Sequence, residues 1–175
     1  TLGQAAKKEY LLDTGEIPVI QVDRGGQVTY HGPGQLMGYV LLPVVAKKIG
    51  SRLLVSLIEQ TLIETLSSFG MTASTESNRP GIYILHQKIA SIGLRIRKGY
   101  SYHGFALNVC MDLTPFERIH PCGEKDRVVT HMHRYLPEIS FNEVLNRVIE
   151  LFKKNFQYAT LTITPTPWHE EIVTL

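Results

Sequence analysis

The sequence predicts an α+β fold, a mixed, largely antiparallel β-sheet with helices packed on it. Two segments with helical periodicity flank consecutive segments rich in branched and aromatic residues, which is the pattern of sequential hairpins. At 175 residues, with 43% apolar and 19% charged side chains, the chain has the size and composition of one globular domain with a hydrophobic core. No apolar run reaches the roughly 18 residues that cross a bilayer. We therefore expect a soluble domain without a membrane span.

The first part of the chain is predicted to form two strands around a glycine-rich loop. Strand-like runs of branched apolar residues cover 17–22 and 36–44. Between them, five of the fourteen glycines lie from Gly25 to Gly38, and such a concentration indicates unusual backbone geometry. The glycine cluster is therefore expected to be a loop that connects two strands.

Two amphipathic helices are predicted. The first begins with Ser51 as a plausible N-cap and ends just before Gly70. The second begins at Ser140, where Glu143 completes a capping box, and ends near Phe156. Apolar residues three or four positions apart form the buried stripes, Leu54, Leu57, Ile58, Leu62, Leu66 and Phe69 in the first and Val144, Leu145, Val148, Ile149, Phe152 and Phe156 in the second.

The segment between the helices is predicted to supply most of the sheet. Strands are expected over 81–85, 88–97 and 100–109, with a hairpin turn at Lys98 and Gly99. A last edge strand is expected over 160–164. Alternation of Ile92, Leu94 and Ile96 with Gly93, Arg95 and Arg97 fits a strand that has one covered face.

The densest chemical signal is the segment RGGQVTYHGPGQ at 24–35. Its glycines allow the backbone to approach a ligand and to direct N–H groups at an oxyanion, a carboxylate or a phosphate, and Arg24 and His31 could add a charge or a hydrogen bond. The segment matches neither the Walker pattern nor a Rossmann fingerprint. A glycine-rich turn without a ligand is the alternative interpretation.

The two cysteines, Cys110 and Cys122, exclude a disulfide scaffold and a four-cysteine zinc site. Cys122 lies in the polar segment PCGEKDR, which has the character of a loop, so its thiol is expected to be accessible. Cys110 ends an apolar strand and is expected to be a small core residue. For Cys122 the sequence leaves open a nucleophile and an inert thiol, with a disulfide between the two as a third possibility.

Several single residues also bear on function. Lys88 opens a strand among apolar neighbours, so its ammonium is expected to be partly desolvated, although a solvated strand end is the commoner case. His103 interrupts an apolar strand and is interpreted as a satisfied core group. His131 and His133 lack a third metal ligand and are expected at the surface, so no metal site is predicted.

The charge balance argues against a dedicated nucleic-acid binder. The chain has 18 basic and 16 acidic side chains, a formal net charge of +2. A modest basic surface is one interpretation of the clustered cations, and a solvated face is the other. The cations concerned are Arg95, Arg97 and Lys98, with Lys47, Lys48 and Arg52.

Three long motifs resemble the lipoyl(octanoyl) transferase family, the octanoyl-acyl-carrier-protein:protein octanoyltransferases. They are RGGQVTYHGPGQL at 24–36, KIASIGLRIRKGYSYHGFALNV at 88–109 and PCG at 121–123, and their order and spacing agree over most of the chain. The resemblance implies the fold of the lipoate-protein and biotin-protein ligase catalytic module. It also implies a single acyltransferase domain over 1–175 that lacks an N-terminal segment present in the family.

The resemblance assigns roles to particular residues. It makes Cys122 the acyl-thioester nucleophile and Lys88 the partner that tunes the pKa of its thiol, a Cys/Lys dyad. His103 is a possible supporting residue. The substrate-binding positions that it implies are Arg24, Gly25, Gly26, Gln27, Val28, Thr29, Tyr30 and His31, then Ser91, Ile92 and Gly93, and finally Gly104, Phe105 and Ala106.

The activity that this family resemblance implies is octanoyl transfer in lipoate biosynthesis and protein lipoylation, without a cofactor. The donor would be octanoyl-acyl carrier protein. The acceptors would be the lipoyl domains of 2-oxoacid dehydrogenase complexes and the glycine cleavage H protein. An ATP-dependent lipoate-protein ligase and a non-catalytic module that binds acylated proteins are the competing functions. Bacterial cytoplasm is the expected compartment, and neither nucleic acid nor a membrane is an expected partner.

Overall fold

A computed structural model describes residues 1–77, 79–121 and 128–163. Its centre is a five-stranded sheet in the order β1-β5-β4-β3-β2, and every neighbouring pair of these strands is antiparallel. The α+β class and the antiparallel sheet expected from the sequence are therefore confirmed. The strands are β1 (Gln35–Tyr39), β2 (Ser74–Glu76), β3 (Arg79–Ile84), β4 (Gln87–Arg97) and β5 (Tyr100–Asn108).

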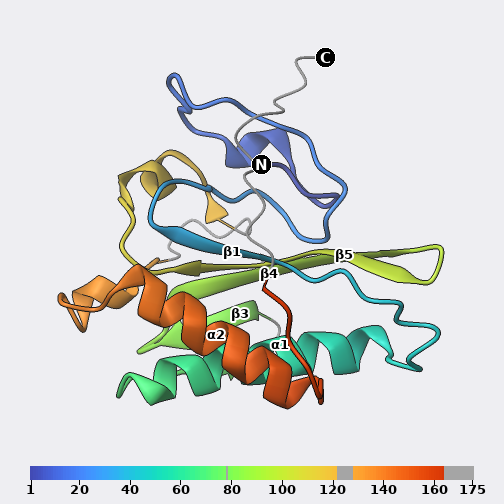
Figure 1. The fold of residues 1–175 in the computed structure, drawn as a ribbon. Helices are drawn as coiled ribbons and strands as arrows, with labels where there is room; N and C mark the ends of the chain where they lie inside the picture. Colours follow the sequence, from blue (N-terminus) through green and yellow to red (C-terminus); the bar gives the residue numbers. More distant parts are fainter. Residues whose placement is uncertain (78, 122–127, 164–175) are drawn as a thin grey trace.

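The helices and the N-terminal segment cover opposite faces of the sheet. Figure 1 shows α1 (Ser51–Ser68) and α2 (Phe141–Asn155) on one side, and the segment 1–34, drawn in blue, on the other. Three short 3-10 helices complete the described elements: η1 (Lys8–Tyr10), η2 (Thr114–Arg118) and η4 (Met132–Arg134). The sheet therefore has a helical layer on one face and the N-terminal segment on the other.

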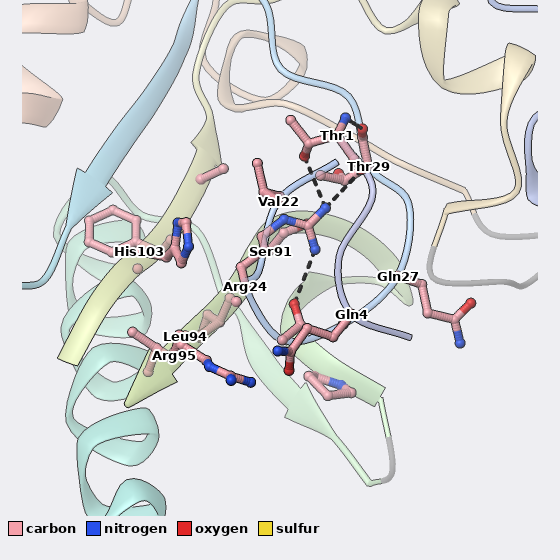
Figure 2. Close-up of a pocket in the computed structure, with 18 of the residues that line it drawn as sticks. Thr1, Gln4, Val22, Arg24, Gln27, Thr29, Ser91, Leu94, Arg95 and His103 are labelled. Atoms are coloured by element: carbon pink, nitrogen blue, oxygen red, sulfur yellow. Dashed lines mark hydrogen bonds between the residues drawn. The ribbon is translucent and has the colours of Figure 1, made fainter. Parts of the chain in front are cut away.

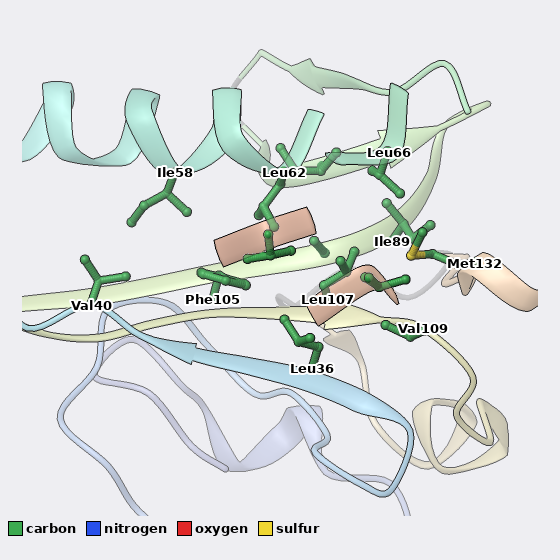
Figure 3. Close-up of a cluster of buried hydrophobic side chains, with 14 of the residues drawn as sticks. Leu36, Val40, Ile58, Leu62, Leu66, Ile89, Phe105, Leu107, Val109 and Met132 are labelled. Carbon is green, nitrogen blue, oxygen red and sulfur yellow. The ribbon is translucent and has the colours of Figure 1, made fainter. Parts of the chain in front are cut away.

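The main core lies between the sheet and α1. Figure 3 shows Ile58, Leu62 and Leu66 of α1 pointing at side chains of β4 and β5, among them Ile89 and Leu107. All five side chains are completely buried, and burying each one contributes about 1.5–3 kcal/mol relative to exposure. Helix α1 forms because its apolar positions fall on this one face.

The helix boundaries agree with the sequence to within one residue. The N-cap of α1 is Gly50 rather than Ser51, which is the first helical residue. Ser140 caps α2 as expected, and its backbone N–H donates to the Glu143 carboxylate at 3.2 Å. In the predicted α2 stripe, Leu145 is 37% exposed, so the buried side of this helix is narrower than expected.

The hairpin between β4 and β5 is confirmed at the expected turn. Both Lys98 and Gly99 have positive φ, 49° and 83°, which is the geometry of the two-residue turns that match the twist of antiparallel strands. Arg97 then faces Tyr100, and the two strands stay in register back to Ala90 opposite Leu107.

Two predicted strands are wrong. The segment 17–22 makes only an isolated bridge, Gln21 with Leu2, and the side chains of Val19 and Ile20 are exposed because no long partner strand lies beside them. The described part of the predicted last strand, 160–163, is exposed and is not assigned to a strand. Branched residues favour strands, but a strand also needs a neighbour to pair with.

Candidate active site

A cavity of about 950 Å³ lies between the glycine-rich segment and the sheet. Its floor comes from β4 and β5, one wall from residues near Arg24, and further lining from β1, β3 and the start of α1. Figure 2 shows Arg24 over the strand that carries Ser91, Leu94 and Arg95, with His103 on the neighbouring strand. The fold therefore brings two of the three sequence motifs, at 24–36 and 88–109, to one cavity.

Most of the predicted site residues line this cavity. Tyr30 is an exception, and Cys122 lies outside the described residues. The predicted residues in the lining are Arg24, Gly25, Gly26, Gln27, Val28, Thr29, His31, Lys88, Ser91, Ile92, Gly93, His103, Gly104, Phe105 and Ala106.

Tyr30 turns away from the large cavity. Its ring packs edge-to-face on Phe116, with the ring centroids 5.5 Å apart, and it lines a second cavity of about 200 Å³. Its neighbours Thr29 and His31 line both cavities. Within the predicted binding stretch, Tyr30 therefore packs on the side of the loop that faces away from the large cavity.

The glycine-rich segment is fastened to the sheet by its own backbone. The N–H of Gly25 donates to the Leu94 carbonyl of β4 at 2.9 Å and so joins the segment to the sheet. Within the segment, the guanidinium of Arg24 donates to the Gly25 carbonyl at 3.1 Å. At the other end, Gly34 has φ +81°, and a Cβ there would lie 2.5 Å from the Cys110 carbonyl oxygen. Only glycine fits this approach, which explains why the loop needs it.

These bonds narrow the choice of backbone donors that face the cavity. Because the Leu94 carbonyl bonds to the glycine segment, the Leu94 backbone points away from β5. Backbone direction alternates along an antiparallel strand, and β4 stays in register with β5 from Ala90 to Arg97. Ile92 therefore also directs its N–H away from β5, whereas Ser91 and Gly93 direct theirs into the ladder.

Lys88 is buried at the edge of the cavity, with 4% of its surface exposed. Its Nζ donates to the Pro80 carbonyl at 2.7 Å and lies 5.8 Å from the centre of the Tyr83 ring. The expected desolvation of this ammonium is confirmed. Gly81, with φ +131°, makes room for it, since a Cβ at Gly81 would lie 2.5 Å from the Lys88 Cε.

The backbone of Lys88 also contacts the segment that follows 122–127. Its N–H donates to the Val128 carbonyl, and its carbonyl accepts from the Thr130 N–H, both at 2.9 Å. The described chain thus returns to Lys88 six positions after Cys122. Cys110, the other cysteine, lies two residues beyond the end of β5, is half-buried and packs against the main core.

His103 is paired with an aspartate that the sequence analysis did not single out. Its Nε2 donates to Asp23 Oδ1 at 2.9 Å, and the Tyr102 hydroxyl donates to Asp23 Oδ2 at 2.6 Å. These bonds, that of His103 first, lower the pKa of Asp23, and the Asp23 bond raises the pKa of Tyr102. His103 is therefore half-buried and satisfied by hydrogen bonding at the cavity wall, not in the core.

The other candidate polar residues lie in different parts of the structure. Arg95 lines the cavity, while Arg97 and Lys98 are exposed at the hairpin that follows it. The two histidines are half-buried, on either side of the completely buried Met132, and His133 Nε2 donates to the Ile139 carbonyl at 2.9 Å. Among the described residues, no group of three or more metal-binding side chains occurs.

The cavity is suited to an apolar ligand with a polar reacting end. Most of its lining surface is apolar and comes from side chains that include Val22, Met37, Ile92, Leu94 and Phe105. Four cationic side chains also reach it: Arg24, Arg79, Lys88 and Arg95. Its volume is in the range of small-molecule sites. Within the described ranges, no helix is both long and apolar enough to span a membrane.

Sequence reasoning missed three buried or bonded polar residues that support the site. Gln35 and Asn108 are buried and bond to each other at 2.8 Å, and Asp23 holds His103. The available signal was a Gln and an Asn among apolar strand residues, since buried amides require partners. Which partners they find depends on the fold.

Comparison with known proteins shows which family and which relatives this chain matches. The family model of the lipoyl protein ligase A/B catalytic domain matches residues 2–153. An octanoyltransferase from Pseudomonas putida is 53% identical over 162 residues, covering 93% of this chain and 75% of that protein. An octanoyltransferase from Coxiella burnetii is 51% identical over 158 residues, covering 90% and 65%. The chain thus spans about two thirds to three quarters of these relatives.

Solved structures agree on the fold. A bipartite lipoate protein ligase from Thermoplasma acidophilum, solved with its E2 lipoyl domain, aligns with a TM-score of 0.71 at 18% identity, covering 95% of this chain and 70% of that chain. A biotin protein ligase from Aquifex aeolicus aligns with a TM-score of 0.56 at 19% identity, covering 71% and 53%. The expected likeness to both ligase modules is confirmed.

Proposed function

The chain belongs to the lipoyl protein ligase A/B catalytic domain family and, within it, to the octanoyltransferases, and we propose that it transfers an octanoyl group to a lysine of a lipoyl domain. One observation carries the proposal: a largely apolar cavity of about 950 Å³ has a buried lysine, Lys88, in its wall. The apolar lining suits an eight-carbon chain, and the lysine suits proton transfer at its reactive end.

In the proposed first step, the Cys122 thiolate attacks the thioester carbonyl of octanoyl-acyl carrier protein and forms an acyl-enzyme. A free cysteine has a pKa near 8.5, so only a few per cent is thiolate at neutral pH, and a nearby ammonium increases that fraction. The return of the described chain to the Lys88 backbone at Val128 supports a position of Cys122 near this ammonium.

Lys88 would serve both steps as a proton donor and acceptor. Its ammonium gives a proton to the departing carrier thiol and becomes neutral, and in the second step it takes a proton from the attacking lysine amine of the lipoyl domain. Burial supports this exchange because it disfavours the charged form of a lysine. The Pro80 carbonyl, 2.7 Å from Nζ, holds the side chain in place for both transfers.

The negative oxygen of each tetrahedral intermediate needs hydrogen-bond donors. The N–H of Ile92 is our candidate, since it points away from β5 at the cavity floor. The N–H of Gly25 is a poor candidate because it already donates to the Leu94 carbonyl. This choice places the reacting carbonyl beside β4.

The proposed acceptors are the lipoyl domains of 2-oxoacid dehydrogenase complexes and of the glycine cleavage H protein. Both kinds of protein partner, carrier and acceptor, are expected to be acidic. Arg97 and Lys98 are exposed on the hairpin that continues the two strands of the cavity floor. We propose that they attract these partners by charge complementarity.

The experiment that tests the function compares two acyl sources with a purified lipoyl domain. With octanoyl-acyl carrier protein and no ATP, the octanoyltransferase hypothesis expects the lipoyl domain to gain an octanoyl amide, detected by intact mass. An ATP-dependent ligase, which shares this fold, would give product only from free octanoate with ATP. Binding of acylated proteins without product from either source would favour the non-catalytic module.

A further inference from the structure

A buried chain of hydrogen bonds connects His31 to the segment beside Lys88. His31 Nδ1 lies 2.8 Å from Gln35 Oε1, Gln35 Nε2 lies 2.8 Å from Asn108 Oδ1, and Asn108 Nδ2 lies 2.9 Å from the Thr130 carbonyl oxygen. Gln35, Asn108 and Thr130 are all buried. Three side-chain bonds therefore join the glycine-rich segment, β1, β5 and Thr130.

The direction of this chain is fixed from its far end. A backbone carbonyl can only accept, so Asn108 must turn its NH₂ group to Thr130 and its oxygen to Gln35. Gln35 must then turn its own NH₂ group to Asn108, which leaves its oxygen facing His31. Nδ1 of His31 therefore carries a hydrogen, and in the neutral imidazole Nε2 carries the lone pair.

His31 is also held in its neutral form. Burial is the largest effect and lowers the pKa of its imidazole. The Gln35 bond raises this pKa by less than burial lowers it, and the positive charges of the Thr1 amino group and of Arg24 lower it further. The side chain lines the large cavity. The cavity wall thus contains a neutral histidine whose proton-accepting nitrogen is set by the fold.

The proposed reaction requires such a group. A lysine side chain is an ammonium at neutral pH, and it must lose two protons to become an amide nitrogen. Lys88, neutral after the first step, can take only one of them. A second acceptor is needed before the amine can attack.

We propose that His31 Nε2 is this second acceptor and takes the first proton from the lysine ammonium of the lipoyl domain. The neutral amine then attacks the thioester carbonyl, its second proton passes to Lys88, and the C–S bond breaks to return the Cys122 thiolate. His31 releases its proton to water, so the cycle yields one amide, one carrier thiol and one proton. The inference rests on the proposed function. Gln35 and Asn108 are positioning residues for His31.

The decisive variant is His31→Asn. Its side-chain NH₂ group can replace Nδ1–H as the donor to Gln35, so the buried chain stays satisfied, but nothing replaces Nε2. The control is His133→Gln, which changes a half-buried histidine outside the cavity lining. Each protein is first loaded with octanoyl from the carrier, and single-turnover transfer is then measured near pH 7 to the lipoyl domain and to hydroxylamine, an amine that is already neutral.

Loss of a general base typically costs between about 10²- and 10⁴-fold in rate. We expect the ratio of transfer to the lipoyl-domain lysine over transfer to hydroxylamine to fall by a factor of this size in His31→Asn and to keep the parent value in His133→Gln. Equal losses for both amines, or no loss, would overturn the role of His31. Failure of the parent protein to load any octanoyl group would instead overturn the proposed function, and this role with it.

A spectroscopic measurement checks the tautomer without turnover. In ¹⁵N NMR of the whole protein, the proposal expects His31 to show a protonated Nδ1 and an unprotonated Nε2 near pH 7. A protonated Nε2 would contradict the fixed direction of the chain and overturn the proposal, whatever the rates show.

Discussion

At the scale of single residues, the site contains two titratable side chains that are hydrogen-bonded at the cavity, the buried Lys88 and the half-buried His31. Lys88 is almost completely buried, yet its ammonium is held by the Pro80 carbonyl and lies beside the Tyr83 ring. His31 is held by the buried amide of Gln35. A buried polar group is costly unless it has partners, so these contacts are what allow the fold to keep titratable side chains at an apolar cavity.

The lowered pKa of His31 makes a prediction about stability. Because the imidazole takes up a proton less readily in the folded protein than its ordinary pKa of 6.5 allows, the unfolded chain binds more protons just below that pH. The contribution of neutral His31 to the free energy of unfolding is therefore fully present above about pH 6.5 and is lost as the pH falls below it. Urea unfolding between pH 7.5 and 5 should show this loss in the parent protein.

The matched comparison is again His31→Asn, which removes the titrating group and leaves all others in place. The drop in unfolding free energy between pH 7.5 and 5 should be smaller in this variant than in the parent. Identical pH dependence in the two proteins would show that His31 is not held neutral by its surroundings.

Only those residues of the site that belong to a local sequence motif could be predicted from the sequence. Lys88 and the glycine-rich segment stand out because of their neighbours in the chain. The bond between Gln35 and Asn108 joins positions 73 apart, and no local pattern indicates that these two meet. Tyr30 shows the opposite limit, since it belongs to the motif but turns its ring to Phe116, outside the large cavity.

At the scale of elements, β3 is shaped to accept the Lys88 side chain of β4. Gly81 has φ +131°, and a Cβ there would lie 2.5 Å from the Lys88 Cε and 2.6 Å from the Ala90 carbonyl oxygen. The register of the two strands also shifts between Ile82 and Tyr83. The irregular pairing at this point makes room for a long side chain inside the sheet.

Substitution of Gly81→Ala should therefore destabilise the protein through both backbone strain and steric contact. The matched control is Gly70→Ala, which has φ +77° but open space around the added methyl group. We expect Gly81→Ala to lose roughly 1–3 kcal/mol more than the control in urea unfolding, the usual cost of overpacking. Equal losses in the two variants would mean that the Lys88 contact is not tightly packed.

The elements themselves differ in how well their sequences specify them. Both helices could be placed because their apolar periodicity and the Ser140 and Glu143 capping box are local signals. The β4–β5 hairpin was equally visible at Lys98 and Gly99. The strand expected over 17–22 failed because strand formation depends on a partner, and that segment has only a bridge to Leu2.

At the scale of the whole molecule, different parts of the chain cover the two faces of the sheet. The helices and the main core lie on one face and the N-terminal segment on the other, and the cavity shares Ile92, Leu94 and Phe105 with the main core. The general architecture followed from the sequence, but the covering of the second face by a segment without regular strands did not. That covering creates the cavity.

The charge distribution over the molecule leads to a prediction about partner association. Replacing Arg97 and Lys98 by Gln should slow association with octanoyl-acyl carrier protein at low salt and flatten its salt dependence, because steering by exposed charge is screened by salt. The control replaces Lys153 and Lys154 at the end of α2, in the helical layer. Stopped-flow association rates that respond equally to both pairs would contradict a specific role of the hairpin.

The most direct test of the central claim is the mass of the protein after incubation with octanoyl-acyl carrier protein alone. The proposed mechanism expects one octanoyl adduct in the parent and in Cys110→Ser, and no adduct in Cys122→Ser. Lys88→Met should form the adduct much more slowly while keeping the fold, since Met has a similar length and no ammonium. An adduct that persists in Cys122→Ser, or its absence from the parent while lipoyl domains are still octanoylated, would contradict the acyl-enzyme mechanism.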